Sequence, residues 1–266
     1  MPVSGINRYF RLIKHIKNPG EYLLHKKSRK KRSLVFSTKP NQITFEVPES
    51  LYQVFKEIFM ADVYEINDLA KNLTEKPIVV DIGANAGFFD FILLSKLPNA
   101  QIFAFEPMPA NIERLKKTVS QNQWLEKCIF LYQMAVTGKQ QSHLDIYMED
   151  TNDNQVVASI FSGFNKSNTK AIRVESISLT EIFVKNNITS IDLLKMDCEG
   201  SEYDILYNTT PDLIQKIKRM VIEVHDIDDQ KNNLVSFKKY LEQLGFSVTS
   251  QPINSFCHAV EAFLKP

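Results

Sequence analysis

Acidic and small side chains follow an apolar run near the middle of this 266-residue sequence, in the segment 78-IVVDIGANAGF-88. Asp81 ends the run, and Gly83, Asn85 and Gly87 follow at alternate positions. Glycine is scarce, with 8 in the whole chain, so two glycines four residues apart are informative. Such a turn lets a ligand approach the main chain, and the N–H groups of a following helix attract a negatively charged group. A plain tight turn between a strand and a helix is the alternative.

A second acidic side chain ends the next apolar segment, 101-QIFAFE-106. A carboxylate at this place, Glu106, can accept hydrogen bonds from both ribose hydroxyls of a nucleotide. The sequence has no G-x-G-x-x-G at the first turn, which disfavours a dinucleotide. The third segment ends with 133-QMAVTG-138, where the small Ala135 and Gly138 leave space for a flat ring. Together these features predict a nucleotide site.

Two later segments, 191-IDLLKMD-197 and 220-MVIEVH-225, carry charges inside otherwise apolar runs. Side chains of a strand alternate between its faces, so Lys195 and Asp197 share one face, as do Glu223 and His225. An unpaired buried charge is costly, and neighbouring strands would pair Lys195 with Glu223 and place Asp197 beside His225. A purely structural ion pair is the alternative to a functional one.

A divalent cation is a further alternative at this edge, since it prefers oxygen ligands and accepts imidazole. The candidate side chains are those of Asp197, Glu199, Glu202, His225 and Asp226. Their spacing fits no defined metal-binding loop, and we predict no metal site.

The elements that must position these residues alternate along the chain. Buried strands are expected at 78–82, 101–106, 129–136, 191–197 and 220–225, with shorter or closing ones at 43–47, 143–148, 156–161, 171–178, 246–250 and 257–264. Helices are expected at 49–73, 88–96, 109–122, 201–207, 212–218 and 229–244. This alternation predicts an α/β, doubly wound parallel sheet with helices on both faces and a ligand beyond the carboxyl ends of its strands.

Charged residues are unevenly distributed along the chain, although the net charge is only +1. Residues 1–50 hold 11 Lys and Arg against 3 acids, and 26-KKSRKKR-32 has six cations in seven positions. This patch could contact an anionic membrane surface, nucleic acid or an anionic glycan, and a solvated arm is the alternative. We therefore expect a basic helical N-terminal extension over 1–42 and one domain over 43–266.

Targeting signals are not evident in the sequence. It shows no apolar segment typical of a signal peptide and no run long enough for a transmembrane helix. Cys128, Cys198 and Cys257 are widely spaced, which fits a reducing compartment. We expect a soluble, cytoplasmic protein.

Several motifs occur in one order along the chain: VVDIGANAGFF, AFEPMPANIERL, AVTGK, V-x-x-I-S-L-T-E-I, IDLLKMDCEGSEYDIL and VIEVH. From about residue 43 to 245 the sequence resembles the FkbM-type S-adenosylmethionine-dependent methyltransferases, and 50–65 also resembles the segment that precedes their first motif. The resemblance implies a seven-strand, Rossmann-like methyltransferase sheet, mostly parallel, whose last strand runs antiparallel beside the sixth.

The resemblance also implies roles for individual residues. Asp81, Gly83, Asn85 and Gly87 would line the methionine end of S-adenosyl-L-methionine, Glu106 would hold its ribose, and Ala135 would lie near its adenine. Asp197 and Glu199, in a K-x-D-x-E-G pattern, would lie between the cofactor and the acceptor. Cys198 stands where the family usually has an apolar residue.

The implied activity is O-methyl transfer to a hydroxyl of a glycan or of a glycosylated or polyketide-like small molecule. A hydroxyl is a weak nucleophile, so a base near neutral pH helps, and His225 has a suitable ordinary pKa. Asp197 could orient the His225 ring, and Asp197 or Glu199 could instead serve directly. The alternatives are a nicotinamide-dependent oxidoreductase, a catalytically inactive S-adenosylmethionine-binding protein, and an RNA methyltransferase that uses the basic N-terminal patch.

Overall fold

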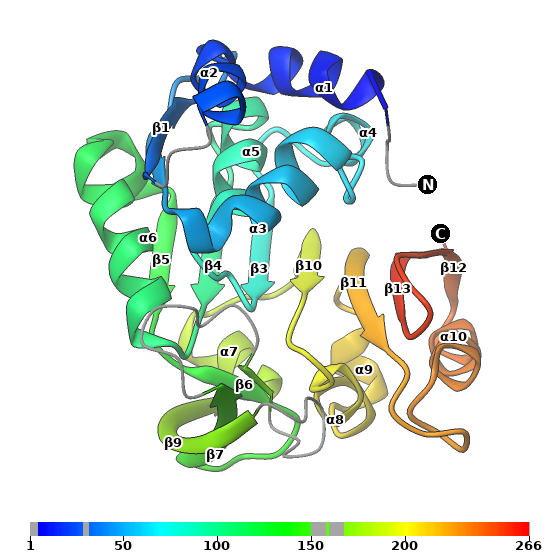
Figure 1. The fold of residues 1–266 in the computed structure, drawn as a ribbon. Coiled ribbons are helices and arrows are strands. Elements are labelled where there is room, and N and C mark those ends of the chain that lie inside the picture. Colours follow the sequence, from blue (N-terminus) through cyan, green and yellow to red (C-terminus); the bar gives the residue numbers. More distant parts are fainter. Residues whose placement is uncertain (1–4, 29–31, 150–157, 160–167, 266) are drawn as a thin grey trace.

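A seven-stranded sheet forms the centre of the molecule in the computed structural model, which describes residues 5–28, 32–149, 158–159 and 168–265 (Figure 1). Its order is β12-β13-β11-β10-β3-β4-β5. The strands are β3 (Ile78–Ile82), β4 (Gln101–Phe105), β5 (Ile129–Tyr132), β10 (Leu193–Met196), β11 (Arg219–His225), β12 (Phe246–Pro252) and β13 (Cys257–Leu264). β13 runs antiparallel to both β11 and β12, and the other pairs are parallel. The predicted fold class is confirmed.

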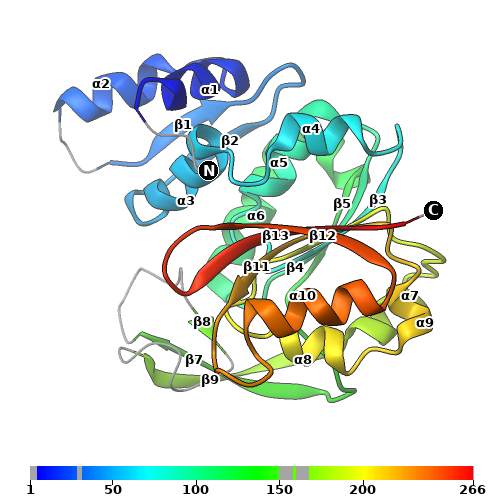
Figure 2. The same ribbon diagram turned by 90° about the vertical axis from the view of Figure 1, so that its right-hand side faces the viewer.

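Both faces of this sheet are buried, as the continuous apolar runs of its strands predict. Val79 and Leu193 point to the face covered by α5 (Phe88–Lys96) and α6 (Pro109–Gln121). Val80 and Leu194 point to the opposite face. That face is covered by α7 (Leu179–Lys185), α8 (Glu202–Tyr207), α9 (Pro211–Ile214) and α10 (Leu234–Gln243), and Figure 2 shows α4 and α5 on one side of the sheet and α8, α9 and α10 on the other.

The N-terminal part of the chain packs onto the α5 side of the sheet. It contains α1 (Asn7–His15), α2 (Gly20–Ser28) and the hairpin of β1 (Leu34–Ser37) and β2 (Thr44–Val47). Leu12 and Phe36 are buried in the same apolar cluster as Val79 and Phe91. The expected boundary between residues 42 and 43 thus falls inside a hairpin, and the apolar core continues across it.

The expected helix over 49–73 is interrupted. The structure has η1 (Glu49–Leu51), α3 (Tyr52–Lys56), the π-helix η2 (Glu57–Ala61) and α4 (Ile66–Lys71). Asp62 and Glu65 adopt left-handed backbone conformations, with φ of 53° and 47°, so no continuous helix can pass through them. The Asp62 carboxylate then accepts a hydrogen bond from Ile66 N at 2.8 Å, which begins α4.

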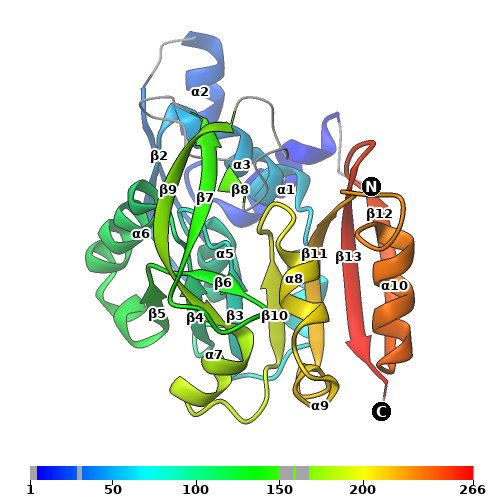
Figure 3. The same cartoon turned by 90° about the horizontal axis from the view of Figure 1, so that it is seen from below.

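The expected third strand, 129–136, is divided between two sheets. β5 ends at Tyr132, and β6 (Ala135–Thr137) joins a second sheet of order β6-β9-β7-β8 (Figure 3). Its other members are β7 (His143–Glu149), β8 (Ala158–Ser159) and β9 (Asn168–Ser178), which confirms the strands expected at 143–148 and 171–178. Of the strand expected at 156–161, only 158–159 lies within the described residues.

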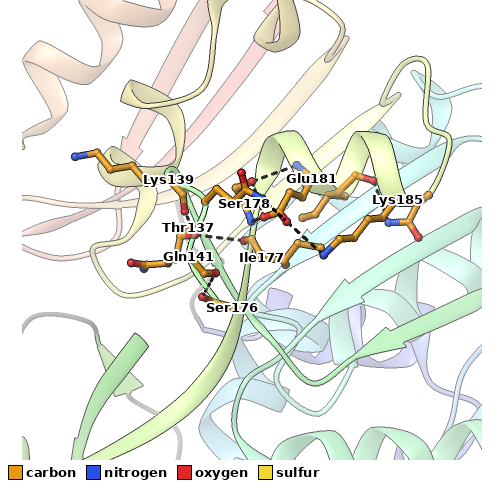
Figure 4. Close-up of polar contacts among 11 residues, drawn as sticks. Thr137, Lys139, Gln141, Ser176, Ile177, Ser178, Glu181 and Lys185 are labelled. Atoms are coloured by element: carbon orange, nitrogen blue, oxygen red, sulfur yellow. Dashed lines mark hydrogen bonds and ion pairs between the residues drawn. The ribbon is translucent and has the colours of Figure 1, made fainter. Parts of the chain in front are cut away.

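Hydrogen bonds at the end of β9 connect the second sheet to α7 (Figure 4). The Ser178 hydroxyl accepts from Glu181 N, while the Glu181 carboxylate accepts from Ser178 N at 3.0 Å, so the two residues form a capping box. The Thr137 hydroxyl donates to the carbonyl of Lys139 at 2.8 Å. Because β6 pairs in parallel with β9, these contacts connect the strand that carries Ala135 to α7.

Candidate active site

The turn after β3 requires glycine for two different reasons. Gly83, with φ of 80°, lies so close to β10 that an added Cβ would be 1.9 Å from the carbonyl oxygen of Asp197. Gly87, with φ of 81°, precedes α5, and its Cβ would be 2.4 Å from Leu115 Cδ1. Asn85 between them is also left-handed, at 51°. The main chain of this turn is therefore held against the carboxyl end of β10.

Glu106 ties the same turn to the start of α6. Its carboxylate accepts hydrogen bonds from Asn85 N at 2.9 Å and from Met108 N at 2.8 Å. Burial raises the pKa of Glu106 to about 7, although these hydrogen bonds oppose the shift. A buried carboxylate at this edge can still accept further hydrogen bonds, because each of its oxygens has two lone pairs.

Lys195 pairs with Asp81 and not, as predicted, with Glu223. Its Nζ lies 3.0 Å from Asp81 Oδ1 and donates to the carbonyl of Gly83 at 2.7 Å. In the parallel register Lys195 lies opposite Asp81 on β3 and opposite Val221 on β11, so Glu223 is two residues further along. The prediction was wrong because the sequence does not specify the offset between two parallel strands.

Lys195 lies beside two buried acids, Asp81 and Asp90. Asp81 and Asp90 are both fully buried, and burial followed by repulsion from Asp81 raises the pKa of Asp90 well above its ordinary value. Burial lowers the pKa of Lys195, but the attraction of Asp81 and Asp197 outweighs it and the pKa is raised. Lys195 is therefore a cation that neutralises Asp81 and holds the Gly83 carbonyl.

A cavity of about 640 Å³ lies beyond the carboxyl ends of β3, β4, β10 and β11. This is the switch point of the sheet, where β3 and β10 are neighbours and the chain changes direction. Seven of the nine site residues predicted from the sequence line this cavity, namely Gly83, Asn85, Glu106, Ala135, Asp197, Glu199 and His225. Asp81 and Gly87 are not among the lining residues and instead support the turn from behind. Gly138 also lies elsewhere, since its Cβ would be 1.8 Å from the carbonyl oxygen of Asp204 on α8.

The His225 ring lies between two glutamate carboxylates on one wall of the cavity. Its Nε2 lies 3.4 Å from Glu199 Oε2, and its Nδ1 lies 3.4 Å from Glu202 Oε1. Burial lowers the pKa of His225, but contacts with Cys257, Glu202 and Glu199 outweigh it and raise the pKa to about 12. The ring is therefore an imidazolium at neutral pH. Asp197 lies one residue beyond Met196, which is opposite Ile222, so this register places Asp197 level with Glu223.

The acids of this wall hold their protons more tightly than usual. Burial, followed by the nearby Asp197, raises the pKa of Glu199 to about 8. Burial also raises the pKa of Asp197, and Lys195 and His225 oppose that shift. Glu199 can therefore exchange a proton near neutral pH.

The sequence did not predict a place in the cavity for several of its residues, among them the ionisable Glu57, Tyr64 and Cys257. Glu57 of η2 and Tyr64 line the cavity from the N-terminal side, and Cys257 lies opposite His225 in the β11–β13 register. Burial raises the pKa of Glu57. The resemblance of 50–65 to the segment before the first family motif was a signal for Glu57 and Tyr64. No comparable signal marked Cys257, because only the antiparallel register brings it to the site.

Glu223, His225 and Cys257 each have an atom that could coordinate a metal ion, and these atoms lie within 4.8 Å of one another. The Cys257 thiol donates to Glu223 at 3.7 Å, and His225 contacts Glu199, so internal contacts already hold the three together. Asp226, considered from the sequence for a cation site, instead accepts from Leu234 N at 2.7 Å and contacts His258 at 3.0 Å.

The order of the strands, the glycine turn after β3 and the carboxylate of Glu106 fit the Rossmann-like fold of methyltransferases. The model of the methyltransferase FkbM domain family matches residues 81–248, and the chain belongs to this family. The family and the fold support an enzyme that takes its methyl group from S-adenosylmethionine.

Curated relatives are distant. Methyltransferase sdnD of Sordaria araneosa is 25% identical over 222 residues, which cover 74% of this chain and 82% of the relative. The 31-O-demethyl-FK506 methyltransferase FkbM of Streptomyces tacrolimicus is 22% identical over 229 residues, which cover 74% of this chain and 82% of the relative. The hexuronic acid methyltransferase AglP of Haloferax volcanii is 27% identical over 165 residues, 62% of each chain. Among solved structures, methyltransferase FkbM of Methylobacillus flagellatus is 12% identical with a TM-score of 0.49, covering 82% of this chain and 56% of that one.

Proposed function

We propose that the protein is an S-adenosylmethionine-dependent O-methyltransferase that acts on a hydroxyl of a glycan or of a glycosylated or polyketide-like small molecule. One observation carries this proposal. The wall formed by Asp197, Glu199 and His225 lies in the same cavity as the Gly83 turn and Glu106, so an acceptor and a nucleotide-bound methyl group can meet there.

The residues around the turn fit the cofactor. Gly83 and Asn85 line the cavity, Glu106 supplies a carboxylate for two ribose hydroxyls, and the small Ala135 leaves room for a flat ring. A cavity of about 640 Å³ lies in the range of small-molecule sites. We assign Gly83 and Asn85 to the methionine end, with Asp81 and Gly87 as their support.

S-adenosylmethionine supplies a methyl group already activated by its sulfonium, so the protein must orient the acceptor oxygen and remove its proton. A new bond forms between carbon and the acceptor oxygen as the carbon–sulfur bond breaks, and the hydroxyl proton passes to a base. We assign this base to Glu199, which lines the cavity and stands 3.4 Å from His225. His225 contacts Glu199 as an imidazolium and positions it, in place of the base role expected from its ordinary pKa. Asp197 is assigned to orientation of the acceptor.

One relative supports a hydroxyl acceptor, because its name specifies 31-O-demethyl-FK506. The name of another specifies hexuronic acid, which is a sugar with both hydroxyl and carboxyl groups. The described wall of this cavity is rich in carboxylates, with Glu57, Asp197, Glu199 and Glu223. Burial raises the pKa of all four acids, and the cations Lys195 and His225 line the same cavity, so this wall does not exclude an acceptor that carries a carboxylate. Neutral and acidic sugars therefore both belong among the acceptors to be tested.

The proposal is tested by incubating the protein with S-adenosylmethionine and a panel of neutral and acidic glycosides, and by measuring release of S-adenosylhomocysteine. Glu199→Gln should lower kcat about a hundredfold while leaving cofactor affinity unchanged. Glu113→Gln, on the exposed side of α6, is the matched control and should retain full activity. Absence of transfer to any hydroxyl, or full activity of Glu199→Gln, would contradict the assignment.

A further inference from the structure

α1 has an apolar stripe on its outer face as well as on its inner face. Leu12 and Ile16 point inward and are buried. Ile6, Phe10 and Ile13, spaced by four and three residues, share the outer face, where Ile6 is 71% and Phe10 is 64% exposed. Ile6 directly precedes α1 and has helical dihedral angles, so it continues this stripe.

α2 adds two exposed leucines at the same end of the molecule. Leu24 is 65% exposed and Leu23 is also exposed. Figures 1 and 2 both show α1 and α2 together at the end opposite β7 and β9. We call Ile6, Phe10, Ile13, Leu23 and Leu24 the N-terminal apolar surface. It holds five of the eleven large apolar side chains that are exposed in the described part of the chain.

Cations surround this surface. Lys14, Lys17 and Lys26 are exposed on or beside α1 and α2, and Lys26 donates to the Tyr9 hydroxyl at 2.7 Å. The sequence continues into the rest of the basic block at 26–32, and residues 1–50 carry 11 cations against 3 acids. A helix with bulky apolar groups on one face and Lys or Arg beside them is typical of segments that lie in a membrane interface.

We propose that the N-terminal apolar surface docks the protein on an anionic lipid bilayer. The apolar side chains enter the boundary between headgroups and acyl chains, and the surrounding lysines contact lipid phosphates. RNA fits this surface less well, because RNA-binding surfaces combine cations with stacked aromatic rings, and four of the five side chains here are aliphatic. None of the helices in the described ranges is long and apolar enough to cross a bilayer, so docking is peripheral.

The helix α1, which carries part of the N-terminal apolar surface, packs against an element that lines the cavity. α1 packs against η2, and Arg11 of α1 forms an ion pair with Asp62, which follows η2. Glu57 and Ile58 of η2 line the cavity. η2 therefore connects the helix that would dock on lipid to the wall of the cavity.

Sedimentation of the full chain with lipid vesicles tests the proposal. We expect the partition coefficient onto vesicles of phosphatidylglycerol and phosphatidylcholine to exceed that onto phosphatidylcholine alone by at least about tenfold, and to fall as salt rises. No sedimentation with the anionic vesicles would overturn the proposal.

The apolar contribution is isolated with matched variants. Phe10→Ser with Ile13→Ser should weaken vesicle binding by at least about tenfold, because two apolar side chains that become buried in the bilayer on docking are lost. Val184→Ser with Val235→Ser is the control, since these valines are 70% and 77% exposed on α7 and α10, and it should bind as the wild type does. Equal loss in both double variants would refute the assigned surface.

Two further readouts keep the outcome unambiguous. Binding of S-adenosylhomocysteine and the melting temperature should be unchanged in both double variants, which separates docking from the proposed activity and from misfolding. A gel shift with single-stranded RNA that persists in the Phe10 and Ile13 variant, together with no vesicle binding, would replace the membrane by RNA as the partner of this region.

Discussion

Replacement of Lys195 by methionine would remove the cation that neutralises Asp81 without greatly changing the volume of the side chain. Lys195 is only 3% exposed, and its Nζ contacts both Asp81 Oδ1 and the carbonyl of Gly83. The substitution therefore leaves Asp81 and Asp90 together in the interior and frees the turn that we assign to the cofactor.

Breaking a buried ion pair by removing one partner costs about 3–5 kcal/mol, because the remaining charge is uncompensated. We expect Lys195→Met to lower the free energy of unfolding by about that amount. The double variant Lys195→Met with Asp81→Asn removes both charges and should recover more than half of the loss. The recovery measures the coupling between the two side chains.

Urea denaturation followed by circular dichroism gives these free energies. Lys71→Met is the control, because Lys71 is 75% exposed and pairs at 3.0 Å with Asp68, which is also exposed. An exposed pair contributes about 1 kcal/mol or less. If Lys195→Met cost no more than Lys71→Met, or if the double variant were less stable than the single one, the role assigned to Lys195 would be wrong.

Three other predictions address the turn, its carboxylate and the second sheet. Gly83→Ala should lower the free energy of unfolding by at least about 2 kcal/mol and abolish cofactor binding, because the added Cβ would be 1.9 Å from a carbonyl oxygen. Gly20→Ala is the control, because the space around its Cβ is open. It should not measurably change the free energy of unfolding in urea denaturation. Burial raises the pKa of Glu106 to about 7, and its ionised form accepts hydrogen bonds from the ribose hydroxyls. The affinity for S-adenosylhomocysteine, measured by calorimetry, should therefore increase as the pH rises through 7 and then level off. Glu106→Gln should abolish this pH dependence, and an affinity of the wild type that does not change with pH would contradict the prediction. Ser178→Ala removes the capping box of α7 and should cost about 1 kcal/mol in the same denaturation assay; no loss would show that the cap is dispensable.

The strands that carry the site could be predicted because their local pattern is strong. Asp81 and Glu106 each follow an uninterrupted apolar run, and such runs fit strands that are buried on both faces. Glycines at 83 and 87 mark the turn because few other residues adopt a left-handed backbone without strain. These signals are local and can be seen in the sequence, and seven of the nine named site residues line one cavity, while their roles stay predictions.

Contacts between strands could not be predicted in the same way. The partner of Lys195 depends on the offset between β10 and β11, and an offset of two residues leaves the face of every side chain unchanged. The separation of β6 from β5 depends on Gly138 N, which donates to Asp204 on α8 at 2.9 Å, a contact between positions 66 residues apart. The role of His225 changed for a similar reason, since its pKa depends on Cys257 of β13 and on Glu199 and Glu202, which follow β10.

Calorimetric titration with S-adenosylmethionine and S-adenosylhomocysteine tests most directly whether the cavity beyond β3 and β4 is a methyl-donor site. The wild type should bind both ligands, and Glu106→Gln should weaken each by about a hundredfold, since the negative charge is lost and an NH2 donor replaces one of the two acceptor oxygens. Glu113→Gln, on the exposed side of α6, should bind as the wild type does. Absence of binding to the wild type, or equal affinity in Glu106→Gln, would contradict the site and with it the proposed function.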